Sequence, residues 1–352
     1  MKENFCAAPW SSLSLDPDGK AKLCCISQQR EPLTEFDQVR ANTKFIEIRN
    51  AFIADQQHDN CATCWNREKE NTEWESRRSI YQYDYYHNLT DPTKFKLEHL
   101  DLRWSNTCNL NCVYCGPVFS SKWAELNGLK QKFRVLPEVS DADLTSLKTL
   151  QLAGGEPMLI KENLNILQRL LEINPDVKIE VTTNLTQIQN NPIYRSLQHF
   201  DNVTFVVSFE STDTRFEYIR NGAVWLEFQR NLNTLAMDFL DIQFNMIYFP
   251  LSAIDIVNAS KVALEYTAPE NIFVVAQSGG HGFDMLSTNA VQYIKQQNLE
   301  QITDSPNVLK QRLLDQINLI TTQRDETYLP MYDNFDQLTK QNHKSIFTEL
   351  YQ

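Results

Sequence analysis

Hydrophobic and polar positions follow two different patterns along this chain, and the change falls near residue 95. From there to residue 276, short apolar runs typical of buried strands alternate with segments whose apolar residues recur every three or four positions, as on one face of a helix. The predicted strands cover residues 95–104, 147–153, 177–183, 203–209, 242–249 and 272–276, and the predicted helices cover residues 120–132, 160–171, 191–198, 224–237 and 254–266. This alternation predicts an α/β fold with a parallel sheet, arranged as a partial (β/α)6 barrel rather than a closed barrel of eight units.

The flanking segments lack this alternation. Before it, two short strands at residues 11–15 and 20–23 surround a turn at Asp16–Gly19, and Phe45, Ile48 and Phe52 lie on one face of a helix over residues 42–53. After it, apolar stripes predict two or three helices and no strand. The predicted domains are a cysteine-rich N-terminal module (1–80), a tyrosine-rich connector (81–94), a partial barrel (95–282) and a helical C-terminal extension (283–352).

The composition limits the classes of function. The chain has 352 residues and a net charge of −12, so broad nucleic-acid binding is not expected, because a phosphate backbone selects a basic face. No stretch approaches the roughly 20 apolar residues of a membrane span, and residues 1–6 lack the apolar core of a signal peptide. We therefore expect a cytoplasmic protein with no membrane partner, whose thiols stay reduced.

All eight cysteines lie between Cys6 and Cys115. In a reducing compartment, grouped cysteines indicate metal ligation rather than disulfides. Cys108, Cys112 and Cys115 follow a predicted strand at spacings of four and three residues, and Tyr114 directly precedes the last of them. Three thiolates from one loop can hold three irons of a cubane [4Fe–4S] cluster and leave the fourth iron open to a small molecule.

This spacing and the aromatic residue resemble the signature of the radical S-adenosylmethionine (radical SAM) superfamily. One β/α unit later, Gly154-Gly155-Glu156-Pro157 resembles the superfamily motif that binds the methionyl amino group of SAM. Glycines let backbone carbonyls approach a charged amine closely. Taken alone, the same residues also suit an ordinary strand-to-helix turn with Pro157 near the start of the helix.

Polar residues near the ends of later strands resemble other parts of the SAM site. Ser208 and Glu210 resemble family residues that bind the ribose or the carboxylate of SAM, and Tyr114 is expected near the adenine. Arg220 resembles the family arginine that pairs with the SAM carboxylate, a role that suits an arginine fork, with a surface arginine as the alternative. Weaker candidates for SAM are Thr183 and Asn184, and weaker candidates for a substrate are Asn245, Tyr248, Gln277 and His281. For a lone histidine such as His281, a hydrogen-bonded structural role is favoured over a substrate contact.

The first 80 residues resemble the SPASM/twitch module, which in family members binds an auxiliary [4Fe–4S] cluster. The resemblance rests on the Cys-x-x-Pro-Trp opening, the Pro-Asp-Gly turn before Cys24-Cys25 and a later Cys-x-x-Cys pair, and it implies Cys6, Cys24, Cys61 and Cys64 as ligands. Four thiolates suit a structural zinc ion equally well. Cys25 is expected not to ligate, because adjacent side chains of an extended chain point in different directions. In most relatives the module follows the radical SAM domain, whereas here it precedes it.

The resemblance implies an enzyme. With an electron from a reductant such as a flavodoxin or ferredoxin, SAM is cleaved to methionine and a 5′-deoxyadenosyl radical, which removes a hydrogen atom from the substrate. Relatives with the auxiliary module suggest that the substrate is a peptide or protein. The alternatives are a dehydrogenase or modifier of a small molecule, sugar or nucleoside, and, in another class, a non-catalytic iron–sulfur electron carrier or a zinc-stabilised binding protein.

Overall fold

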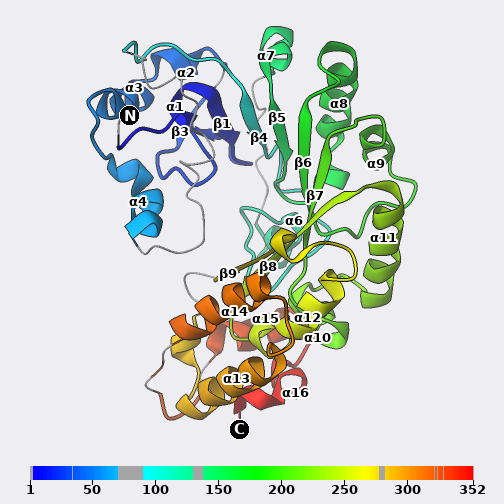
Figure 1. The fold of residues 1–352 in the computed structure, drawn as a ribbon. Helices are drawn as coiled ribbons and strands as arrows, with labels where there is room; N and C mark the ends of the chain where they lie inside the picture. The colour runs from blue at the N-terminus through cyan, green and yellow to red at the C-terminus, as the bar shows by residue number, and fades with distance from the viewer. Residues whose placement is uncertain are drawn as a thin grey trace. The chain divides into compact units, whose positions relative to one another are not determined.

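The computed structural model describes residues 3–33, 35–69, 90–129, 138–276, 282–320, 322, 324–327 and 329–351. They form two compact units (Figure 1). The first unit comprises residues 1–106, 132–180 and 195–202, and the second comprises residues 107–131, 181–194 and 203–352. Most of the predicted connector lies outside the described residues, as do Gln277 and His281. The four predicted domain boundaries stay predictions.

Nine strands form one sheet in the order β3-β2-β1-β4-β5-β6-β7-β8-β9. Their bounds are β1 Ser12–Leu15, β2 Lys20–Lys22, β3 Glu31–Pro32, β4 His99–Leu102, β5 Thr149–Leu152, β6 Lys178–Thr183, β7 Val203–Ser208, β8 Asp241–Tyr248 and β9 Ile272–Ala276. Strands β4 to β9 follow one another in chain order, and the pairs β4–β5, β7–β8 and β8–β9 are parallel. The predicted α/β class, with the mostly parallel sheet of a partial (β/α)6 barrel, is confirmed.

Helices connect these strands in the order that the apolar spacing predicts. The α-helices of the first two thirds of the chain are α1 Ala8–Ser11, α2 Gln38–Ala41, α3 Thr43–Ile53, α4 Ala62–Lys69, α6 Ser121–Leu126, α7 Asp141–Ser146, α8 Lys161–Ile173, α9 Pro192–Leu197, α10 Asp213–Ile219 and α11 Trp225–Asp238. The remaining α-helices are α12 Ile256–Ala263, α13 Thr288–Gln301, α14 Asn307–Leu319, α15 Pro330–Thr339 and α16 His343–Ile346. Short 3-10 turns are η1 Asp59–Cys61, η3 Pro157–Leu159, η4 Ser252–Ile254, η5 Pro269–Asn271, η6 Phe283–Met285 and η7 Thr348–Tyr351.

In the first unit, the N-terminal hairpin is part of the main sheet. Strand β1 pairs antiparallel with β2 through the turn at Gly19, whose φ is 76°, and it also pairs in parallel with β4. The sequence predicts the hairpin but not this second pairing, because strand alternation does not reveal which edge a strand will join. Phe45, Ile48 and Phe52 of α3 are buried as predicted.

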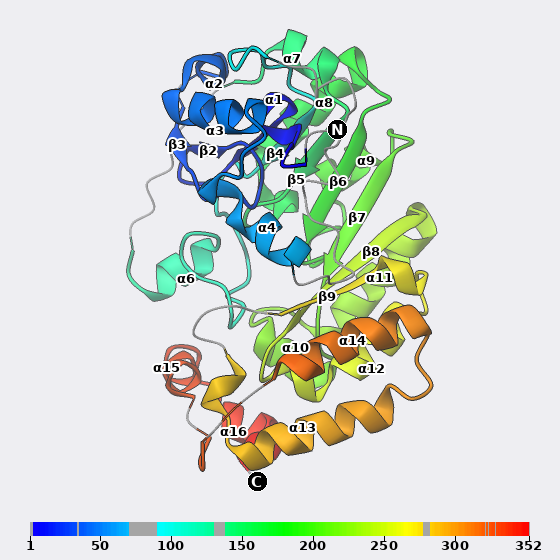
Figure 2. The same ribbon diagram turned by 60° about the vertical axis from the view of Figure 1, so that its left-hand side comes forward.

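In the second unit, the core is rich in aromatic side chains and the last helices pack against it. Phe209 contacts Phe228 of α11 and Phe244 of β8, with ring centroids 5.2 and 5.3 Å apart. Helix α14 lies beside β9 (Figure 2), where the Arg312 guanidinium sits 4.8 Å from the Phe273 ring centroid. Val224 begins the predicted helix 224–237, but in the structure it is the N-cap of α11 and is 45% exposed.

The C-terminal segment contains helices and a break that the sequence does not predict. Two or three helices were predicted after residue 282, but the apolar residues between Phe335 and Leu350 do not lie on one helix, because α15 ends where Lys340 takes a left-handed conformation with φ of 58°. Helix α16 and the turn η7 then follow separately. Within the described part of the chain, no helix combines the length and the apolar character needed to cross a bilayer.

Candidate functional site

The cysteine loop lies in the second unit between β4 and α6, and its backbone is closed by local hydrogen bonds. Cys115 N–H donates to Cys112 O over 2.9 Å. Ser121 at the start of α6 accepts from Cys108 N–H over 3.0 Å and donates its hydroxyl to Cys108 O over 2.9 Å. Ser120 Oγ likewise donates to Leu110 O over 2.6 Å. The two serines therefore tie the helix start to the loop that carries all three thiols.

A second segment, Tyr218–Gly222, runs against the same loop. Val113 N–H donates to Ile219 O over 2.8 Å, and Asn111 N–H donates to Asn221 O over 3.1 Å. Gly222 has φ of 100°, and a Cβ added there would lie 3.2 Å from Asn109 O. Only glycine combines this backbone conformation with so close an approach. The segment that carries Arg220 is thus fixed to the cysteine loop by its own backbone.

The three thiols of the loop interact electrostatically. Burial raises the pKa of Cys112, the Arg220 guanidinium lowers it, and the neighbouring Cys115 and Cys108 raise it again. Burial also raises the pKa of Cys115. Burial therefore opposes the ionisation of Cys112 and Cys115, whereas a positively charged metal centre would favour their thiolate forms. A [4Fe–4S] cluster held by three cysteines fits this donor set.

Arg220 and Glu210 form a buried ion pair beside the loop. Arg220 Nη2 donates to Glu210 Oε2 over 2.7 Å, and the two residues are 3% and 0% exposed. Tyr114 O–H lies 3.4 Å from the same oxygen, and the guanidinium sits 5.7 Å from the Tyr114 ring centroid. Burial raises the pKa of Glu210, while Arg220 and Tyr114 lower it. Burial lowers the pKa of Arg220, but the Glu210 carboxylate more than reverses this.

This ion pair leaves hydrogen-bonding capacity unused. Arg220 Nε and Glu210 Oε1 are buried and have no hydrogen-bond partner within 3.5 Å, although the backbone N–H of Ile247 also interacts with the Glu210 carboxylate and lowers its pKa. Such orphaned groups are costly unless a ligand completes them. An additional carboxylate could accept a hydrogen bond from Arg220 Nε, and a ligand hydroxyl group could donate one to Glu210 Oε1. The structure thus brings Tyr114, Glu210 and Arg220 together next to the thiols, and Arg220 is not a surface arginine.

Asn184 contacts a thiol rather than standing apart from the loop. Its Oδ1 accepts from Thr186 N–H over 3.0 Å, which fixes the orientation of the amide. Its Nδ2 therefore points at Asn109 Oδ1, 3.1 Å away, and at Cys108 Sγ, 3.9 Å away. Leu110 N–H is a second donor to that sulfur, at 3.5 Å. The sequence suggested a SAM contact for Asn184, whereas the contacts seen are with the loop itself.

We expect Asn184→Asp to lower iron retention at the three-cysteine site by about tenfold, because outer contacts of metal ligands typically contribute this much. The change keeps the shape of the side chain but puts an acceptor where a donor faces Cys108. Iron released to a chelator over time would measure it. Asn271→Asp is the matched control, because the Asn271 amide bonds Thr267 instead. Equal iron loss in the two variants would contradict the assigned role.

Gly154–Pro157 lies in the first unit, after β5. Gly154 has φ of 117°, and a Cβ there would lie 2.9 Å from Ser105 O. Gly155 N–H donates to the same oxygen over 3.3 Å. The Glu156 side chain is fully buried and caps η3 by accepting from Met158 N–H over 3.1 Å. The motif is therefore a tight backbone crossing followed by a capped turn, so glycine is required at position 154 whether or not SAM is bound.

The other candidates differ in how they are placed. Ser208 ends β7, is half-buried and lies opposite Asn245 of β8. Thr183 is buried, and its Oγ1 accepts from Leu185 N–H over 2.9 Å. Tyr248 was expected to face a substrate, but it is 1% exposed and its hydroxyl accepts from Asn298 Nδ2 over 3.0 Å. Tyr248 is therefore packed against α13.

Cys6, Cys24, Cys61 and Cys64 line one pocket of the first unit. The other walls of the pocket include Leu23, Phe52 and Thr63. Burial raises the pKa of Cys6, and the thiols of Cys24, Cys61 and Cys64 raise it further. A hydrogen bond from the backbone N–H of Ala8 lowers it. Four thiols from three separate segments thus converge on an apolar cavity, while Cys25 is not among its walls. This arrangement fits a metal centre with four sulfur ligands.

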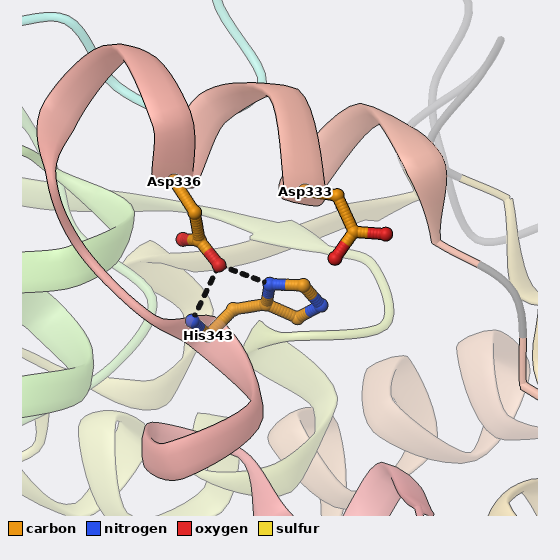
Figure 3. Close-up of side chains that lie close together, drawn as sticks. All are labelled: Asp333, Asp336 and His343. Carbon is orange, nitrogen blue, oxygen red and sulfur yellow. Dashed lines mark hydrogen bonds and ion pairs between the residues drawn. The ribbon is translucent and has the colours of Figure 1, made fainter.

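A third cluster of ionisable groups lies at the end of the second unit (Figure 3). Donor atoms of Asp333, Asp336 and His343 lie within 4.8 Å of one another. Asp336 Oδ2 is 2.6 Å from His343 Nδ1, and Asp336 Oδ1 accepts from Tyr218 O–H over 2.8 Å. His343 Nε2 is 2.5 Å from Tyr351 Oη, and Lys344 pairs with Asp333. Because each of these side chains already has a protein partner, we interpret the cluster as a structural tie between α10, α15 and α16.

Comparison with known proteins agrees with the chemistry of the cysteine loop. A model of the radical SAM superfamily matches residues 102–259. The GTP 3′,8-cyclase of Clostridium botulinum (strain Hall) is 26% identical over 95 residues, which are 27% of this chain and 30% of that enzyme. The GTP 3′,8-cyclase of Desulforamulus reducens is 24% identical over 165 residues, 45% of this chain and 49% of that enzyme. The chain thus spans less than half the length of these curated relatives.

Among solved structures, Streptococcus suis SuiB bound to the precursor peptide SuiA is similar with a TM-score of 0.41. The alignment covers 81% of this chain and 67% of that one, at 15% identity. The superfamily match includes all three loop cysteines, Asn184, Ser208, Glu210 and Arg220, as well as Gly154–Pro157. The match to the radical SAM superfamily model is thus confined to residues 102–259, which contain the candidate residues named above.

Proposed function

We propose that this protein is a radical SAM enzyme in which Cys108, Cys112 and Cys115 hold a [4Fe–4S] cluster. The observation that carries the proposal is the braced loop, in which three interacting thiols lie beside a buried arginine with an unused donor. When bound, the cluster and SAM supply a 5′-deoxyadenosyl radical, which removes a hydrogen atom from the substrate. An electron carrier or a zinc-stabilised binding protein would need the cysteines, but it would not need the buried Arg220–Glu210 pair with its unused donor and acceptor.

The residues of the chain have distinct tasks in this proposal. Arg220 Nε offers a charged donor to the SAM carboxylate, and Glu210 Oε1 offers an acceptor to ribose hydroxyls. Tyr114 excludes water from the ion pair, with its ring 5.5 Å from Phe249. Gly154–Pro157 supplies backbone carbonyls for the methionyl amine. Ser208 is a further ribose contact. The protein's own contribution is thus binding, orientation and exclusion of solvent.

The four-cysteine pocket is proposed to hold an auxiliary [4Fe–4S] cluster on Cys6, Cys24, Cys61 and Cys64. Its support is the convergence of four thiols on one apolar cavity, together with the resemblance of residues 1–80 to the SPASM/twitch module. With all four irons ligated by protein, such a cluster would accept an electron from a substrate radical rather than bind the substrate.

The proposed substrate class is a peptide or protein side chain, because the module resembles those of peptide-modifying relatives. A nucleoside is the second candidate, favoured by the sequence similarity to GTP 3′,8-cyclases. Incubation with GTP, SAM and a reductant separates the two. Consumption of GTP coupled to formation of 5′-deoxyadenosine would favour the nucleoside.

Anaerobic reconstitution with iron and sulfide tests the enzyme. We expect about eight irons per chain, from two four-iron clusters, and release of 5′-deoxyadenosine after addition of SAM and a reductant. Replacing Cys6, Cys24, Cys61 and Cys64 by Ala should leave about four irons and slow, uncoupled SAM cleavage. Zinc in place of iron at Cys108, Cys112 and Cys115, or iron without SAM cleavage, would contradict the proposed function.

A further inference from the structure

The Arg220–Glu210 pair is placed to act on the cluster itself, in addition to any contact with SAM. The backbone of Ile219 and Asn221 is hydrogen-bonded to the cysteine loop. Arg220 lies between them, and its guanidinium sits 5.7 Å from the ring centroid of Tyr114, the residue directly before Cys115. The cation is therefore held beside the part of the loop that carries Cys112 and Cys115.

Solvent does little to weaken this field. The Arg220 and Glu210 side chains are 4% and 0% exposed. Charges that are shielded from water interact more strongly than surface charges and are screened less by salt. Other ion pairs of the second unit are more exposed. Arg215 and Glu349, for example, are 25% and 19% exposed. The Arg220–Glu210 pair is thus a buried ion pair, and both of its members contact Tyr114 of the cysteine loop.

Reduction changes the charge of the cluster by one unit. One electron enters and no proton accompanies it, so the reduced cluster is more negative than the oxidised one. A nearby cation stabilises the reduced form, and a nearby anion stabilises the oxidised form. Net charge and hydrogen bonding around the sulfurs are recognised determinants of iron–sulfur potentials. The two ends of the pair must therefore act in opposite directions.

We propose that Arg220 and Glu210 together set the reduction potential of the three-cysteine cluster, with Arg220 raising it and Glu210 lowering it. The inference rests on the proposed function, because it requires a [4Fe–4S] cluster on Cys108, Cys112 and Cys115. It assigns the pair a role before SAM binds. In that role Glu210 offsets part of the rise in reduction potential that Arg220 causes. The Tyr114 O–H, 3.4 Å from Glu210 Oε2, weakens the effect of the negative charge of the carboxylate.

Redox titration of the reconstituted protein without SAM, followed by electron paramagnetic resonance, tests this role. In Glu210→Gln we expect the ratio of reduced to oxidised cluster at a fixed potential to rise about tenfold, equivalent to about 59 mV for a one-electron couple. In Arg220→Gln we expect the ratio to fall by about the same factor. Arg220→Lys keeps the charge and should stay within about threefold of the wild type.

Two controls accompany the titration. Arg215→Gln removes the arginine of another Arg–Glu pair in the same unit and should leave the ratio unchanged. The signal of the auxiliary cluster is recorded in each variant as an internal reference for the titration. If Arg220→Gln does not bind its cluster, the shift measured in Glu210→Gln tests the proposal by itself, because glutamine preserves the shape of glutamate. A potential that does not rise in Glu210→Gln would then overturn the proposal.

The outcomes separate the two proposals. Shifts of opposite sign in Glu210→Gln and Arg220→Gln support the inference. Unmoved potentials, or shifts of the same sign, overturn it while leaving the proposed function intact, provided that SAM is still cleaved. A protein that binds no [4Fe–4S] cluster at the three cysteines overturns both.

Discussion

Cys112→Ala is expected to abolish SAM cleavage. The 5′-deoxyadenosine formed by the reconstituted variant should fall to the level of a reaction without enzyme, because a cluster with two remaining thiolates cannot be held with one iron open. Cys112 is the middle ligand, and its carbonyl accepts from both Cys115 N–H and Trp123 Nε1. Alanine keeps these backbone contacts, so the loss of activity should come from the sulfur. Quantification of 5′-deoxyadenosine by liquid chromatography measures it.

The chain offers a matched control for this variant. Cys25 is half-buried, follows a cysteine assigned as a ligand, and is not part of the four-cysteine pocket. Cys25→Ala should keep about eight irons per chain, from two four-iron clusters, and unchanged SAM cleavage. Cys112→Ala should keep about four, those of the auxiliary site. SAM cleavage that survives in Cys112→Ala would show that the cluster lies elsewhere.

Gly154→Ala is expected to have the second largest effect. With φ at 117° and a Cβ placed 2.9 Å from Ser105 O, alanine must strain the backbone and displace a neighbouring carbonyl. Strain of this kind costs about 1–3 kcal/mol, and the clash adds to it. We expect a lower thermal midpoint of unfolding and a loss of SAM affinity of about tenfold or more, because a cost of about 1.4 kcal/mol in the bound form is a factor of ten.

Gly116→Ala is the control for this second prediction. A Cβ at Gly116 would meet no atom within 4 Å, although the residue directly follows Cys115. The thermal midpoint should therefore stay near that of the wild type. SAM affinity can be measured by equilibrium dialysis of the reconstituted protein. Equal effects of the two substitutions would show that the conformation of Gly154 is not what matters.

The sequence predicts the parts of this protein that depend on local spacing. Alternating strands and helices predict the order of β4 to β9 in the sheet correctly, because each β/α unit adds its strand next to the previous one. The stripe of Leu309, Leu313, Ile317 and Ile320 is buried as its spacing predicts. The cysteine spacing likewise points to the loop that the superfamily match includes.

Contacts between distant segments could not be predicted in the same way. In the sequence, nothing distinguishes Gly222 except that it lies two residues after Arg220. In the structure, its backbone conformation allows the segment of Arg220 to approach the cysteine loop at Asn109. Asn184 and Cys108 are 76 residues apart, and only the fold shows that the amide faces the sulfur. The pairing of Glu210 with Arg220 was also missed, although both were candidates, because each was assigned to SAM rather than to the other.

The contacts of the last helices imply an order of events during synthesis of the protein. Trp123, which donates to Cys112 O, packs on Phe335 of α15 at 5.6 Å, and Phe335 packs on Tyr218 at 5.4 Å. Asp336 and His343 then tie Tyr218 to α16. The cysteines leave the ribosome long before these supports exist. We therefore expect iron insertion to be completed only after translation of residues 330–351. Until those helices pack against it, the cysteine loop should remain accessible to the protein that donates iron.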